Sequence, residues 1–197
     1  MDSILTITSA ASTHDLTVIA TAKLELGLSD ASQDDELQRL ITEASDQIAA
    51  YCNTVFAKQS YSEVFRRVRC RDRLLLSRTP VDTITSVTVD GSALEAAEYE
   101  VDAESGILYR LESDDRYVWS GDKITVAYSA GYTLLTDLPY TVERACLDLV
   151  KRRYYAKTRD PSLRSLDIPD VGREDYWGGA SLEIIGGLPA DIARSLD

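Results

Sequence analysis

The feature that most constrains the fold of this chain is a change in the spacing of its apolar residues. Up to about residue 52 they recur every three to four positions, as on one face of a helix. From Tyr61 they alternate every second position, as in β-strands, and from Asp137 the helical spacing returns. The sequence therefore predicts an α+β protein in which helices flank an antiparallel β region.

The boundaries of the expected elements follow from caps and turns. Helices are expected over residues 17–27, with Thr17 as N-cap, over 33–52, with Ser32 as cap, and over 138–159. Candidate strands are 61–70, 73–78, 84–89, 98–102, 106–111 and 123–129. Asp90-Gly91 predicts a hairpin turn with two positive φ angles, and further turns are expected at 104–106 and 120–123.

The last part of the chain has a different composition. Beyond Asp160-Pro161, prolines and glycines are frequent and apolar residues follow no sustained period. These 37 residues cannot form a core of their own, so they are either disordered or ordered by a partner. We expect a domain over 1–160, with its β insertion at about 61–132, and an extended C-terminal arm over 161–197.

Composition excludes several classes of protein. The 21 basic and 33 acidic residues give a net charge of −12, which argues against a main task of gripping nucleic acid. His14 is the only histidine, and the three cysteines lack metal-ligand spacing and are expected to be buried reduced thiols. Asp34-Asp35-Glu36 is explained as helix-start charge. We expect no enzymatic activity, no cofactor, no metal site, no membrane span and no secretion signal.

Two basic clusters stand out against the acidic background. Alternation along a strand puts Arg67, Arg69, Arg71 and Arg73 on one face, either as a binding ladder or as a solvated face balanced by Glu98, Glu100 and Asp102. The last expected helix ends with Arg152, Arg153, Tyr154, Tyr155, Lys157 and Arg159, a mixture of cations and aromatic rings typical of an interface or a nucleic-acid contact.

The order of the parts resembles the head-to-tail connector, or adaptor, family of long-tailed bacteriophages and phage-like gene transfer agents. The similarity covers about residues 15–160. It rests on the order of these segments: Ala22-Lys23-Leu24-Glu25-Leu26-Gly27-Leu28, Ala50-Tyr51-Cys52-Asn53, Leu76-Ser77-Arg78-Thr79-Pro80-Val81, Ile84-Thr85-Ser86-Val87-Thr88-Val89-Asp90-Gly91, Val126-Ala127-Tyr128-Ser129-Ala130-Gly131-Tyr132 and Leu138-Pro139.

This resemblance implies a small helical bundle carrying the β insertion. It also implies a structural protein at the head-tail junction of a particle, assembled in the bacterial cytoplasm. Many copies, usually twelve, form a ring on the portal protein, extend the channel through which double-stranded DNA passes without specific binding, and carry a downstream connector, stopper or tail protein. An acidic ring suits such a channel because it repels the duplex from the wall.

From the sequence we assign the expected contacts as follows. The portal or neighbouring-subunit interface comprises Arg152, Arg153, Tyr155, Lys157, Arg159, Leu163, Leu166, Ile168, Tyr176, Trp177, Leu182, Ile184 and Ile185, and an inter-subunit charge ladder comprises Arg67, Arg69, Arg71 and Arg73. The alternative hypothesis is a nucleic-acid-binding module that uses the arginine-rich strand and the basic helix.

Overall fold

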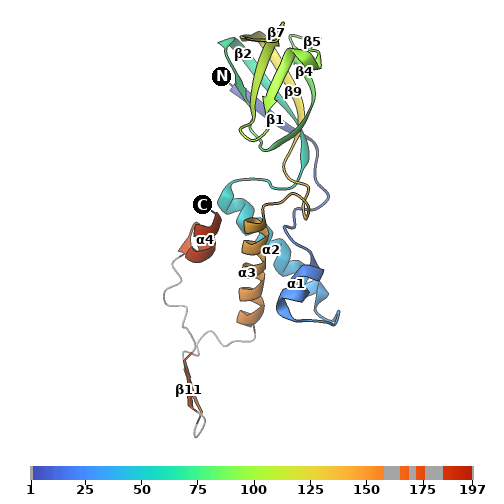
Figure 1. Ribbon diagram of the computed structural model, residues 1–197. Coiled ribbons are helices and arrows are strands. Elements are labelled where there is room, and N and C mark those ends of the chain that lie inside the picture. The colour runs from blue at the N-terminus through green and yellow to red at the C-terminus, as the bar shows by residue number, and fades with distance from the viewer. Residues whose placement is uncertain (1, 158–164, 169–171, 176–183, 197) are drawn as a thin grey trace. The chain divides into compact units, whose positions relative to one another are not determined.

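The computed structural model describes residues 2–157, 165–168, 172–175 and 184–196 (Figure 1). The chain divides into two compact units. The β unit consists of residues 1–13 and 56–136, and the helical unit consists of residues 14–55 and 137–197. This is the α+β class that the sequence predicts.

Helices α1 (Ile19–Leu26), α2 (Asp34–Cys52), α3 (Tyr140–Lys157) and α4 (Ala190–Leu196) form the helical unit, together with the short hairpin β12 (Ile184–Ile185) and β13 (Leu188–Pro189). The predicted apolar stripes of α2 and α3 are buried, from Leu37 to Ile48 and from Val142 to Val150. Gly27 ends α1 with a φ of +71°, as expected for a left-handed C-cap. In the part of the chain that the structure describes, no helix is long and apolar enough to cross a membrane.

The two predicted N-caps are wrong. Val18 and Gln33 occupy the cap positions of α1 and α2, and neither makes a side-chain cap bond. Thr17 is instead buried and donates its hydroxyl to Glu143 of α3 at 3.2 Å. Ser32 donates both its hydroxyl and its backbone N–H to the Asp30 carboxylate in the preceding turn. Tertiary and turn contacts therefore use the hydroxyls that the sequence assigns to caps.

The β unit contains two antiparallel sheets. The larger has the order β1-β2-β9-β4-β5, and the smaller has the order β3-β7-β6 with β8 also paired to β7. The strands are β1 (Asp2–Ser9), β2 (Gln59–Arg71), β3 (Leu74–Leu75), β4 (Val81–Val89), β5 (Ser92–Ala93), β6 (Tyr99–Asp102), β7 (Ile107–Glu112), β8 (Asp115–Tyr117) and β9 (Trp119–Ala130), with the 3₁₀ turn η1 (Ala96–Glu98) before β6.

The core of the β unit joins the two sheets. Trp119 of β9 is fully buried and donates its indole N–H to the carbonyl oxygen of Leu108 in β7 at 3.0 Å. Phe65, Val126 and Tyr128 are buried in the same cluster. Apolar packing and one well-placed hydrogen bond therefore hold the smaller sheet to the larger.

The turns and the N-terminal strand differ in how well the sequence predicts them. Asp90-Gly91 has φ values of +50° and +91°, which confirms the predicted hairpin turn. The turn expected at 120–123 is wrong because β9 runs through it, paired with β2 along one edge and β4 along the other. The sequence also misses β1, which pairs with β2 and extends the β unit beyond the expected insertion.

The last described residues fold onto the helical unit. Gly186 and Gly187, with φ values of +56° and +89°, form the two-residue turn between β12 and β13. Leu188 and Ile192 are buried, and α4 lies beside α3 (Figure 1). The sequence pattern indicates no core for this stretch, yet its apolar side chains complete the core of α2 and α3.

Candidate interface surfaces

The basic end of α3 is neutralised within the helical unit. Arg152 pairs with Asp191 of α4, and Arg153 pairs with Glu43 of α2 at 3.5 Å. Lys157 pairs with Glu36 at the start of α2 at 2.5 Å. These contacts bind α3 to its neighbours, so most of the positive charge that the sequence assigns to an interface is compensated inside the unit.

A second ion-pair group lies nearer the middle of α3. Lys151 and Arg144 both contact the Glu25 carboxylate of α1, each at 3.2 Å. Hydrogen bonds from Lys151 and then Arg144 hold the pKa of Glu25 below its usual value of 4.5. Tyr154 donates its hydroxyl to Gln33 at 2.6 Å, and its ring meets that of the exposed Tyr155 edge-on.

Most of the remaining predicted interface residues cannot be placed. Arg159, Leu163, Tyr176, Trp177 and Leu182 lie outside the described residues. Leu166 and Ile168 belong to strand β10 (Ser165–Ile168), which pairs with β11 (Gly172–Asp175). Ile184 is exposed and Ile185 half-buried in β12. The role of all these residues at an interface stays a prediction.

The predicted arginine ladder does not form one regular strand face. Phe65 and Val68 are both buried while Arg66 and Arg67 between them are exposed, and Arg67 has a φ of +53°. Cys70 also has a positive φ, and the register with β9 shifts between Val68 and Arg71. These irregularities break the two-residue alternation on which the single-face prediction depends.

The carboxylates expected to balance the ladder lie elsewhere. Glu100 and Asp102 belong to β6, which pairs with β7 and not with β2, and Glu98 caps the turn η1. Among the described residues only Arg69 of the ladder has an ion-pair partner, Asp122 at 3.0 Å. Arg67, Arg71 and Arg73 are therefore exposed cations without an ion pair in the described part of the β unit.

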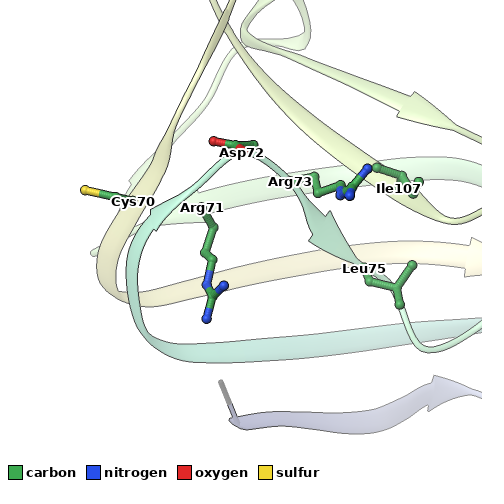
Figure 2. Close-up of a pocket in the computed structure, with 6 residues that line it drawn as sticks. All are labelled: Cys70, Arg71, Asp72, Arg73, Leu75 and Ile107. Carbon is green, nitrogen blue, oxygen red and sulfur yellow. The ribbon is translucent and has the colours of Figure 1, made fainter.

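Two adjoining open depressions lie where β2 ends and β3 begins. The first, of about 650 Å³, is lined by Cys70, Arg71, Asp72, Arg73, Leu75 and Ile107, and Figure 2 shows the side chains of Arg71 and Arg73 leaving the turn in different directions. The second, of about 370 Å³, shares Asp72 and Arg73 and adds Tyr109, Arg116, Tyr117 and Val118. We call the residues lining both depressions the arginine surface.

The arginine surface combines cations with exposed apolar area. Arg116 lies over the ring of Tyr109, 3.9 Å from its centroid. Leu75 is 62% exposed and Tyr117 is 45% exposed, which is unusual for large apolar side chains. Arginine and tyrosine are enriched at the centres of protein interfaces, where such area becomes buried. This surface is therefore the best candidate interface among the described residues.

The structure also corrects the prediction for the cysteines. Cys146 is buried in the helical unit, Cys52 is half-buried, and Cys70 is exposed on the arginine surface. Burial raises the pKa of the Cys146 thiol to about 11. No group of three or more metal-ligating side chains occurs in the part of the chain that the structure describes.

Comparison with known proteins gives a family match and structural matches. The model of the family described as "HCP: Head completion protein" matches residues 15–162, and no match is found among curated proteins. A chain in a structure described as "Neck of empty GTA particle computed with C6 symmetry" is 17% identical, with a TM-score of 0.56 over 83% of this chain and 89% of that chain. A chain of "Virion of native gene transfer agent (GTA) particle" is also 17% identical, with a TM-score of 0.55 over 77% and 84%.

Proposed function

Because the chain belongs to the head completion protein family, we propose that it is a structural head-to-tail connector of a phage or phage-like particle. The observation that carries this proposal is the extent of the family match, which includes most of both units. The fold is shared with chains of gene transfer agent necks and virions, which supports a place at the head-tail junction.

In this role the chain acts by assembly and not by chemistry. Copies form a ring, twelve in the family it resembles, that sits on the portal protein, continues the DNA channel and carries a downstream connector, stopper or tail protein. The net charge of −12 per chain supports a channel that repels DNA. It also requires attractive contacts between subunits, and the uncompensated Arg71 and Arg73 are suited to provide them.

Portal docking is assigned to the helical unit and the segment that follows α3. Leu188 and Ile192 are buried within the helical unit, so their side chains are not available to contact the portal. The docking residues are then better sought among Tyr176, Trp177 and Leu182, which the sequence singles out as apolar anchors.

The proposal is tested by measuring the mass of the purified protein alone and mixed with its candidate portal, by native mass spectrometry. A defined multi-copy complex with the portal is expected. The double variant Tyr176→Ala and Trp177→Ala should lose the complex while keeping its fold, and the double variant Ile4→Ala and Ile7→Ala, at exposed positions of β1 in the β unit, is the matched control. Failure of the wild-type chain to bind its portal at any concentration would contradict the assignment as a head-to-tail connector.

The nucleic-acid-binding module remains the alternative, favoured only by the exposed arginines of β2. The second basic cluster that this alternative would use, at the end of α3, is largely neutralised by ion pairs within the helical unit. It predicts duplex binding whose affinity falls steeply with salt, with a slope that reports several phosphate contacts. Absence of duplex binding at low salt would eliminate it.

A further inference from the structure

The β unit carries a second charged region, of opposite sign to the arginine surface. Between Thr79 and Tyr109 the chain has seven acidic residues and no lysine or arginine. Glu100, Asp102 and Glu104 are exposed, and no basic side chain pairs with them among the described residues. We call these three residues the acidic edge.

Strand pairing places the two charged regions on opposite edges of the smaller sheet. Strand β6, with Glu100 and Asp102, pairs along one edge of β7. Because Arg110 of β7 pairs with both β6 and β8, β8 lies along the other edge, where β3 also pairs. The strand β8 carries Arg116, and Arg73 directly precedes β3. Two strand spacings, about 10 Å, separate the edges.

The outer edge of β6 is also free to be approached. In the part of the chain that the structure describes, β6 is the last strand of its sheet. Its charged side chains prevent unspecific strand pairing, as is common at sheet edges. The same carboxylates remain able to accept bonds from guanidinium groups, which match their geometry.

We propose that the arginine surface of one copy docks on the acidic edge of the next copy. This inference rests on the proposed function and names the partner surface of the arginines. A contact between two different surfaces of identical chains is head-to-tail, and it generates a closed ring when the rotation between copies closes. Each copy then neutralises cations of one neighbour with carboxylates of the other, although every chain is acidic overall.

The apolar residues of the arginine surface add to the proposed contact. Leu75 and Tyr117 are exposed in the single chain, beside Arg73 and Arg116. Covering them with a neighbour removes apolar area from water, while the charges at their rim select the orientation.

Two charge-reversal variants test the proposal. The first carries Arg71→Glu and Arg73→Glu. The second carries Glu100→Arg and Glu104→Arg and leaves Asp102 in place, because Asp102 accepts hydrogen bonds from the backbone of the turn that follows. A control with Asp35→Arg and Asp46→Arg makes the same charge change as the second variant at exposed positions of α2, outside both the acidic edge and the arginine surface.

Self-association of the full chain is measured by sedimentation velocity at low salt and high protein concentration. Each reversal is expected to weaken it by about a hundredfold or more, because like charges then face each other, and the control is not. Mixing the two variants should restore association, since every contact in the mixed oligomer pairs opposite charges.

Three results overturn the proposal: no self-association of the wild-type chain, loss in the first variant alone, or no restoration on mixing. Loss of duplex or portal binding in the first variant alone would assign the arginines to those partners instead. Portal binding is recorded in parallel, because a chain that joins the portal but does not self-associate through these surfaces contradicts this inference and leaves the proposed function standing.

Discussion

Replacing Ile192 by alanine tests the finding that the C-terminal helix α4 belongs to the helical unit. Ile192 is 4% exposed, and α4 and α3 line a groove of about 200 Å³ that includes Tyr140 and Ala145. The substitution removes three carbon atoms from this contact. At about 0.8 kcal/mol for each buried methylene, the lost burial amounts to about 2.4 kcal/mol. Any cavity that remains would add to this cost.

The expected result is local detachment of α4. The helix has only seven residues, and α1, α2 and α3 also pack on one another, so α4 can separate from α3 without unfolding the unit. A loss of about 2.4 kcal/mol corresponds to a rise of roughly fiftyfold in the detached population, at 1.4 kcal/mol for each factor of ten. Hydrogen exchange of the α4 backbone amides measures this population, and those of α2 should change much less.

The matched control is Asp191→Ala on the same helix. It removes the ion pair between Asp191 and Arg152. Both side chains are more than a third exposed, so the loss should lower the stability of the docked helix by less than about 1 kcal/mol. Equal exchange rates in wild type and Ile192→Ala would refute the docking of α4. Equal acceleration in both variants would show that the ion pair with Arg152 holds the helix as strongly as the burial of Ile192 does.

Three other predictions concern single side chains. Under native conditions at mildly alkaline pH the exposed Cys70 should react quickly with a thiol reagent, whereas Cys146, with its pKa raised to about 11 by burial, should react only after unfolding, as mass spectrometry of labelled peptides can show. Trp119→Phe should lower the free energy of unfolding by about 2–3 kcal/mol in urea titrations, because it leaves a void and removes the hydrogen bond to the Leu108 carbonyl oxygen. Tyr117→Phe, at an exposed position, should change the free energy of unfolding by less than about 0.5 kcal/mol, and equal effects would contradict the buried role of Trp119. The Glu25 carboxyl has a lower pKa in the folded state than its usual 4.5, so its contribution to stability is present above about pH 4.5 and lost as the pH falls through the folded value; the difference in melting temperature between wild type and Glu25→Gln should therefore be largest near neutral pH, and a difference that grows on acidification would show the opposite sign.

The arrangement of helices and strands could largely be predicted from the sequence because it depends on local periodicity. The stripes of α2 and α3 are spaced at three and four residues whether or not a partner is present, and burial follows. The turn at Asp90-Gly91 is likewise local, since these two residues adopt positive φ at little cost. The order of these parts also carries the family resemblance, which the family match confirms.

The candidate site could be predicted only in part, because its geometry depends on a broken pattern. The sequence singles out Arg71 and Arg73, but assigns them to a regular strand face with Arg67. Positive φ values at Arg67 and Cys70 reorient the strand, and strand alternation cannot foresee such bulges. Tyr109 and Arg116 join the surface from β7 and β8, and no spacing in the sequence links them to β2.

The sequence by itself determined the class of the protein: its helices, its β region, its net charge of −12 and its family. Tertiary structure decided which charges are available. The cations of α3 form ion pairs with Glu25, Glu43 and Asp191, which are distant in sequence. Arg71 and Arg73, in contrast, have no ion pair among the described residues. The physical reason is that periodicity is a property of neighbouring residues, whereas the compensation of a charge depends on which distant segment packs beside it.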